Sequence, residues 1–494
     1  MLRCEASLRA VPRTNYNPSG NLVGGWTAAP SLVTGRRSLG VASARLDDAS
    51  RFLYAIGGED AAGTALTSIE VAALDRFGKL GAWTKQSNEL KVARSGHAVV
   101  RRGLYLYAIG GTSSVNGTRG ADNTDPSGTP LTSIERAKLL EPSGAPTLDA
   151  ATASTATGTL SKGTYYYRVA AVLDGSTPAT EGETLPSEVV VVTLTATGQV
   201  QLSWTAPSVG SVASYRVYRT AAADGASGSE VLLETGVVGT TFTDTGSEMP
   251  GTEKPMTLGA TGPWVTLATA LNRARLNTSA TIAPAPNGDL FVYVVGGWGQ
   301  CAAAPAAQMS CYELAPISSD GATLGAFTDG TTALGRGRMR IGLDTMTASN
   351  GPADFATNAG AGTAFVLVTG GKGASATANT SEYATVTPGG QLTAWASPTG
   401  FSSERDGTQL IIANGYAYAI FGGDAPMYSQ TADQSAVPTV TSTTLAFPNW
   451  SNAAANFTTK VGRHGAVSES AYFYVIGGTS NDTDALTTVT QILH

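Results

Sequence analysis

An arginine recurs near the start of six similar stretches of this 494-residue chain. In five of them it follows an apolar residue by four positions, as with Leu32 and Arg36, and the sixth is less regular. Six guanidinium groups gathered around one axis would attract anions. Alternatively, each arginine binds backbone carbonyls or a carboxylate of an adjacent repeat, which we favour because the arginine belongs to the repeat itself. The six residues are Arg36, Arg94, Arg275, Arg338, Arg405 and Arg463.

Two short acidic segments could supply oxygen ligands to a metal ion. Asp122 and Asp125 belong to one of them, and Asp482 and Asp484 to the other. Ca²⁺ prefers clusters of carboxylate and amide oxygens, but neither segment has the spacing of a twelve-residue calcium loop. We therefore expect solvated turns and no cofactor, with Ca²⁺ as the alternative that these segments leave open.

Aromatic side chains in loop-like segments offer a different kind of contact. Trp298 and Tyr428 are the main examples. Flat aromatic faces can stack on sugar rings, and they can equally fill the interior of a loop. A surface glycan and a protein are therefore both candidate partners.

The chain has three cysteines. Cys301 and Cys311 lie in one loop-like stretch, CAAAPAAQMSC. A disulfide between them would close a short ring and stabilise the protein by ~2–3 kcal/mol, and two free thiols are the alternative. Cys4 has no evident partner in the sequence, so it is either free or links two chains.

The elements that must position these residues form a repeat. Six apolar runs rich in β-branched and aromatic residues end in Gly-Gly, which is typical of strands buried on both faces and followed by tight turns. Most are followed by a segment like TSIEVAAL and by another like LGAW. Each unit therefore reads as four short strands. The runs are residues 52–58, 104–111, 290–297, 364–371, 417–423 and 471–478.

Four-stranded units that recur about every 50 residues are typical of propeller blades. The Gly-Gly after the second strand, the later Trp and the Arg-Ser-Gly-His start of the unit at Arg94 resemble the kelch repeat. The resemblance implies an all-β, six-bladed propeller. The sixth unit lacks a fourth strand, and residues 20–26 read like one. We therefore expect the N-terminal segment to close the ring, which removes an exposed sheet edge.

An insertion interrupts the second unit between its third and fourth strands. Its alternating strand patterns are separated by Gly, Ser and Pro turns. The Trp204 and Tyr215 strands and the Asp244 turn resemble a fibronectin type III or immunoglobulin-like sandwich with a permuted strand order. The expected domains are residues 1–141 and 255–494 for the propeller and 142–254 for the insertion.

Antiparallel connectivity places the loops between second and third strands on one face of the propeller and the insertion on the opposite face. Three of these loops are long, at residues 112–130, 298–308 and 424–438. Long loops on a rigid scaffold commonly bind partners, so we expect contacts with a protein or a glycan on this face.

Kelch propellers include the copper enzyme galactose oxidase, whose site needs two histidine ligands and tyrosines, one of them cross-linked to a cysteine. The histidines here, His97, His464 and His494, lack ligand-like spacing. The Asp-box repeat of sialidase-type glycosidases is also missing from the sequence. We therefore expect no catalytic residues and no enzyme activity, and an oxidase or glycosidase is the alternative.

Composition excludes several partners. The net charge is −6 and no run of Lys or Arg exceeds two residues, whereas nucleic-acid binding needs clustered cations. No apolar run reaches the ~18 residues that span a membrane. The N-terminus shows no apolar segment of a secretory signal.

These features predict a non-enzymatic extracellular structural or adhesive protein. It would be a subunit of a surface appendage, filament or virion, with further copies of itself among its protein partners. A monomeric glycan- or protein-binding module is the alternative.

Overall fold

The computed structural model describes residues 22–115, 128–174, 181–208, 210–301, 305–374, 380–397, 405–423, 432–435, 439–441, 444–446, 450–452, 460–481 and 484–493. Nearly all of its regular structure is antiparallel β-strand, which confirms the all-β class. Helical structure in these ranges is limited to a 3-10 turn (Pro142–Gly144) and to α1 (Phe355–Asn358). None of the described helices is long and apolar enough to cross a membrane.

Six small sheets share one layout, in which the first strand of each unit lies at one edge. Sheet 1 contains β2 (Gly40–Arg45), β3 (Arg51–Ile56), β4 (Ile69–Leu74) and β5 (Thr84–Lys85). Sheet 2 contains β6 (Ala98–Arg102), β7 (Tyr105–Ile109), β8 (Ile134–Lys138) and β17 (Val265–Thr266). Sheet 3 contains β19 (Ser279–Pro284), β20 (Leu290–Val295), β23 (Tyr312–Ile317) and β24 (Thr328–Asp329).

The remaining three sheets repeat this layout, with one strand taken from the N-terminal segment. Sheet 4 contains β25 (Gly342–Met346), β26 (Phe365–Thr369) and β27 (Ser381–Thr385). Sheet 5 contains β28 (Gln409–Ala413), β29 (Tyr416–Ile420), β30 (Ala432–Ser435) and β33 (Trp450–Asn452). Sheet 6 contains β34 (Gly465–Glu469), β35 (Tyr472–Ile476), β36 (Val489–Leu493) and β1 (Val23–Ala29).

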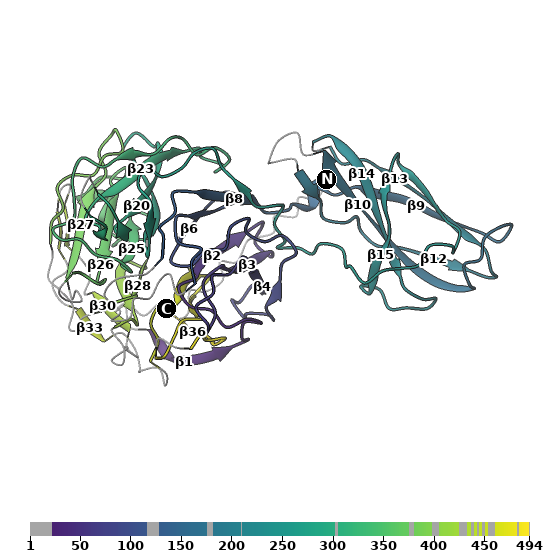
Figure 1. The fold of residues 1–494 in the computed structure, drawn as a ribbon, viewed down its shortest axis with the longest axis horizontal. Helices are drawn as coiled ribbons and strands as arrows, with labels where there is room; N and C mark the ends of the chain where they lie inside the picture. The colour runs from purple at the N-terminus through teal and green to yellow at the C-terminus, as the bar shows by residue number, and fades with distance from the viewer. Residues whose placement is uncertain are drawn as a thin grey trace, which may run out of the picture.

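The first strands of the six sheets surround a common axis. Strand β2 contacts β6, β6 contacts β19, β19 contacts β25, β25 contacts β28, β28 contacts β34, and β34 contacts β2. Figure 1 shows the sheets gathered in this circular arrangement, with purple β1 and yellow β36 side by side. We refer to sheets 1 to 6 together as the ring.

A backbone hydrogen bond at the end of the second strand joins neighbouring sheets. In sheet 1, Gly57 and Gly58 have φ angles of 55° and 93°, and Gly58 N donates to Arg94 O of sheet 2 at 2.8 Å. A Cβ atom on Gly58 would lie 2.8 Å from Arg37 O, so glycine is required. In sheet 5, Phe421 (φ 49°) takes the place of Gly57, so the pattern shifts by one residue there.

Tyrosines on the second strands add a further link between sheets. Tyr107 Oη of sheet 2 donates to Gly321 O in the β23–β24 hairpin of sheet 3, at 2.5 Å. The accepting glycines all have positive φ angles, which lets their carbonyls face the neighbouring sheet. The equivalent bonds are Tyr54 to Gly259, Tyr293 to Gly390 and Tyr474 to Gly78.

Removing one of these hydroxyls tests the link. We expect Tyr107→Phe to lower the free energy of unfolding by about 1–2 kcal/mol, because the buried carbonyl of Gly321 loses its donor. Tyr105→Phe is the matched control on the same strand, since the Tyr105 ring keeps its contact with Arg136. Equal denaturation midpoints for the two variants would contradict the prediction.

Residues 147–244 form two further sheets between β8 and β17. Strands β11 (Glu181–Glu183), β12 (Val190–Leu194), β10 (Gly163–Asp174), β14 (Val212–Thr220) and β15 (Glu230–Val237) form one sheet. Strands β16 (Thr241–Asp244), β13 (Gln199–Thr205) and β9 (Thr147–Ser154) form the other. We call residues 147–244 the lateral module, which extends away from the ring in Figure 1.

The lateral module has an apolar core of its own. Trp204 and Tyr215 contact each other there with ring centroids 5.1 Å apart. Beside them, Tyr167 Oη and Arg219 Nη1 both bind a buried Asp244 carboxylate oxygen, at 2.7 and 2.5 Å. These groups join the two sheets of the module.

Two further small sheets form within the loops of the ring. Strands β18 (Arg275–Leu276), β21 (Trp298–Gly299) and β22 (Ala307–Gln308) form one of them. The other pairs β31 (Thr439–Val440) with β32 (Leu445–Ala446).

Candidate functional site

Five of the six recurring arginines are buried and paired with an acid. Arg94 Nη2 lies 2.9 Å from Glu135 Oε1, and Arg94 Nη1 donates to the carbonyls of Gly110 and Ser133 at 2.7 and 2.8 Å. The remaining pairs are Arg36–Glu70, Arg275–Glu313, Arg338–Glu382 and Arg405–Asp433. These guanidinium groups are thus committed to structural bonds.

The partner groups differ in location from the sequence-based expectation. Glu135, Gly110 and Ser133 all belong to sheet 2, the sheet that Arg94 itself precedes, and not to an adjacent repeat. The Arg94 backbone, in contrast, bonds the neighbouring sheet 1 through Gly58. Each arginine therefore fixes its own sheet with the side chain and the preceding sheet with the main chain.

Arg463 does not occupy the position of the other five, so its place in the series is wrong. Val461 takes that position, because its carbonyl accepts the hydrogen bond from Gly422 N. Thr490 stands where the other sheets carry their acid. Arg463 lies two residues further on, with a φ angle of 53° like that of Arg340 at 54°. The sequence analysis missed this two-residue shift, because Arg463 lies so close to the position of the other arginines.

The axis of the ring contains a cavity of about 340 Å³. The first strands of all six sheets line it. Asp344 on β25 is among the lining residues, and its two carboxylate oxygens accept hydrogen bonds from Thr345 N at 2.7 Å and Ile412 N at 2.8 Å. Asp344 was missed in the sequence, because one charged residue at a position that is apolar or Thr in the other sheets does not reveal that the position faces a cavity.

Burial raises the pKa of Asp344 to about 6, although the two backbone N–H groups act in the opposite direction. The folded pKa therefore lies above the ~3.9 of an unfolded chain. The stability associated with the protonated carboxyl is complete below pH ~4 and is lost as the pH rises through about 6.

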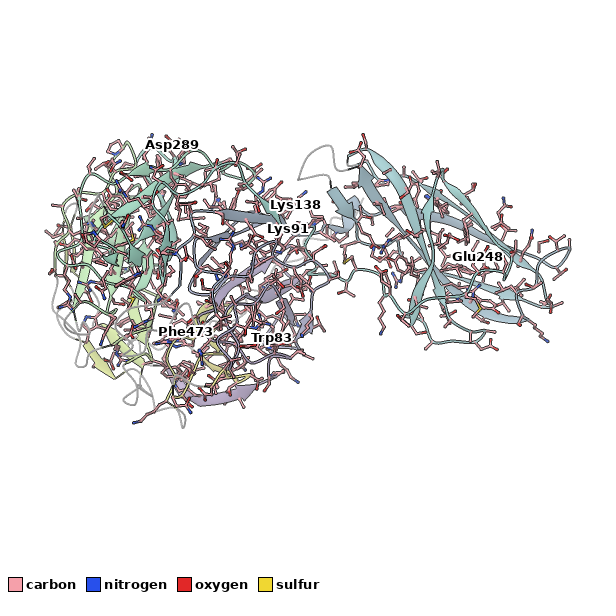
Figure 2. The ribbon with its side chains drawn as sticks, viewed as in Figure 1. Trp83, Lys91, Lys138, Glu248, Asp289 and Phe473 are labelled. Atoms are coloured by element: carbon pink, nitrogen blue, oxygen red, sulfur yellow. A yellow bond between two sulfur atoms is a disulfide. The ribbon has the colours of Figure 1, made fainter. Side chains whose placement is uncertain are left out.

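Asp344→Asn should remove this dependence on pH. Between pH 4 and pH 8 in metal-free buffer, we expect the free energy of unfolding of the variant to rise relative to the wild type by up to ~3 kcal/mol. Urea denaturation at several pH values measures the difference. Asp289→Asn, on the exposed β19–β20 hairpin at the periphery of Figure 2, is the control and should parallel the wild type. A pH-independent difference for Asp344→Asn would contradict the assignment.

The two described histidines are structural. His97 and His464 are buried at the ends of equivalent loops, and burial lowers the pKa of each to about 3, so both are neutral. His464 contacts the Phe421 ring, with centroids 5.7 Å apart. Among the described residues, no group of three or more His, Cys, Asp and Glu side chains is arranged to hold a metal ion. His494 lies outside the described residues.

The loop of sheet 3 contains the disulfide predicted from the sequence. Cys301 and Cys311 are bonded, which confirms that pairing. Trp298 on β21 lies beside them, half-buried between Leu276 and Gln308 of the same small sheet. Its ring is thus only partly available for a ligand.

The predicted oxygen ligands are only partly within the described residues. Both carboxylate oxygens of Asp484 accept hydrogen bonds from its own loop, through Thr479 Oγ1 and Ser480 Oγ, each at 2.5 Å. Burial opposes ionisation of Asp484, but these bonds prevail and lower its pKa. The other four residues of the predicted binding set, with Cys4, lie outside the described ranges: Asp122, Asp125, Tyr428 and Asp482.

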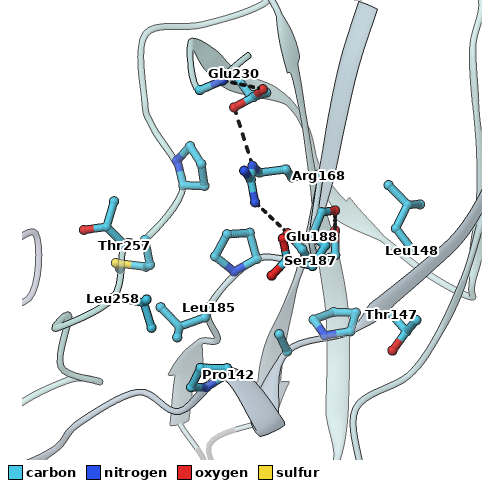
Figure 3. A pocket seen from close by; sticks show the side chains of 16 residues that line it. Pro142, Thr147, Leu148, Arg168, Leu185, Ser187, Glu188, Glu230, Thr257 and Leu258 are labelled. Atoms are coloured by element: carbon cyan, nitrogen blue, oxygen red, sulfur yellow. Dashed lines mark hydrogen bonds and ion pairs between the residues drawn. The ribbon is translucent and has the colours of Figure 1, made fainter. Parts of the chain in front are cut away.

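A second cavity, of about 500 Å³, lies at the root of the lateral module (Figure 3). Its apolar wall includes Pro142, Leu185 and Leu258. Arg168 crosses it, donating to Ser187 O at 2.9 Å and lying 3.5 Å from Glu230. An apolar group with a hydrogen-bond acceptor would suit these walls.

Comparison with known proteins adds little to this description. No family model matches the sequence, and no curated protein matches it. Among solved structures, the chain is similar to one titled "Structure of YjhT", at 11% sequence identity and a TM-score of 0.46. The match covers 95% of this chain and 97% of that chain. Function must therefore be argued from the residues of this chain.

Proposed function

We propose that the ring is a six-bladed kelch-type propeller and that residues 142–254 are an inserted β-sandwich. The six sheets of similar layout, whose first strands contact one another in a closed order, support the propeller. Two facing sheets around one apolar core support the sandwich.

On this scaffold we propose a non-enzymatic extracellular structural or adhesive protein that assembles with further copies of itself. The observation that carries the proposal is the use of the recurring arginines: five are buried in ion pairs within their own sheets, so their guanidinium groups serve the scaffold and not a reaction. A protruding module on a rigid ring suits lateral contacts between subunits, and the Cys301–Cys311 disulfide is consistent with an oxidising location.

The mass and shape of the native particle test this function. We expect light scattering and negative-stain imaging under oxidising conditions to show filaments, rings or other regular assemblies. A uniform monomer of 50.2 kDa would contradict the proposal. That result would favour the second candidate, a monomeric binding module, for which the 500 Å³ cavity beside Arg168 is the supporting observation.

A further inference from the structure

We propose that the axial cavity binds a hard metal cation, with Asp344 as its anchoring carboxylate. The cavity is closed laterally by β2, β6, β19, β25, β28 and β34. It holds about 340 Å³, which is enough for an ion that keeps several of its waters. The proposal does not depend on the proposed function.

The charge inside this cavity is unbalanced. Among the described residues that line it, Asp344 is the one that is ionised at neutral pH, because His97 is neutral there. The mouth of the cavity is lined by two arginines, Arg340 and Arg463. The Arg340 guanidinium is held by Asp406 through two contacts of 2.7 Å. No Lys or Arg is among the described residues that line the cavity itself, so the negative charge of Asp344 favours a mobile cation there.

The donor atoms in the cavity are mostly oxygens. Asp344 uses one acceptor site on each carboxylate oxygen for Thr345 N and Ile412 N, which leaves further acceptor sites on both oxygens. Five further side chains with oxygen atoms line the same cavity, and they are Thr278, Ser279, Thr281, Gln409 and Ser468.

Backbone groups complete this surface. Each of the six lining strands is the edge of its sheet, so its outer carbonyls have no partner strand. Ca²⁺ takes six to eight oxygen ligands from carboxylates, carbonyls and water. The cavity offers such a set: one carboxylate, backbone carbonyls and retained water. Soft metals prefer sulfur or imidazole ligands instead, so a hard cation suits the cavity better.

Calorimetric titration of the full chain with CaCl₂ tests the site, with choline chloride at the same ionic strength as the background. We expect saturable binding of one Ca²⁺ by the wild type and at least tenfold weaker binding by Asp344→Asn. Asp289→Asn should bind like the wild type, because it removes an exposed carboxylate and leaves the cavity intact. Melting curves should show the same ranking, with Ca²⁺ raising the midpoint of the wild type and of Asp289→Asn only.

Three results would overturn the proposal. Binding that survives Asp344→Asn would place the cation elsewhere, and failure of the wild type to bind Ca²⁺ would remove the site. Saturable binding of methylammonium chloride without binding of CaCl₂ would assign the cavity to protonated amines instead of metal ions. Asp344→Asn is expected to fold, since the change is isosteric and removes a half-buried charge.

Discussion

Deletion of residues 1–29 is expected to abolish the cooperative unfolding of the ring. Strand β1 supplies the outer strand of sheet 6, pairing Thr27, Ala28 and Ala29 with residues 491, 490 and 489 of β36. Its loss exposes the outer edge of β36. It also removes the covalent connection between sheets 6 and 1, because β1 of sheet 6 leads directly into β2 of sheet 1. Buried Leu22 is lost as well, and so is the contact between Trp26 and Phe421, whose ring centroids are 4.8 Å apart.

The expected cost of this deletion is about 5 kcal/mol, which is comparable with the whole stability of many domains. Circular dichroism during heating measures it, with size-exclusion chromatography to detect association through the exposed edge. Deletion of residues 1–20 is the matched control, because it keeps Leu22 and all of β1. An unchanged melting curve for the longer deletion would refute closure of the ring by the N-terminal segment.

Glu313→Gln is expected to destabilise the ring by about 3–5 kcal/mol, since it leaves a buried guanidinium without its counter-ion. Arg275 and Glu313 are fully buried, 2.7 Å apart, and Glu313 also accepts hydrogen bonds from Asn272 N and Arg273 N. Chemical denaturation measures the change. Asp329→Asn breaks the exposed Arg273–Asp329 pair in the same sheet and should cost less than ~1 kcal/mol.

Sheet 6 suggests a second arm for this experiment. It carries Val461 and Thr490 where sheet 3 carries Arg275 and Glu313. Replacing both partners together, as Arg275→Val with Glu313→Thr, should therefore cost less than Glu313→Gln alone, because no buried charge is left unpaired. A double variant less stable than Glu313→Gln would contradict this prediction. It would mean that losing the whole ion pair costs more free energy of unfolding than leaving Arg275 without its counter-ion.

Local sequence patterns were sufficient for the strands. The apolar runs before each Gly-Gly lie in β3, β7, β20, β26, β29 and β35, because hydrophobic runs and positive-φ turns are properties of a few consecutive residues. The short separation of Cys301 and Cys311 likewise made their pairing predictable. The exact register was less accessible, as Phe421 in sheet 5 and Arg463 in sheet 6 demonstrate.

Contacts between residues that are distant in the sequence were determined only by the tertiary structure. The sequence alone determined an all-β chain and its repeat, and it indicated the disulfide that the structure contains. Which acid meets each arginine, which carbonyl meets Tyr107, and that Asp344 faces a cavity became visible only once the sheets were assembled. The physical reason is that burial, charge balance and hydrogen-bond partners depend on packing between residues tens to hundreds of positions apart, which local periodicity does not encode.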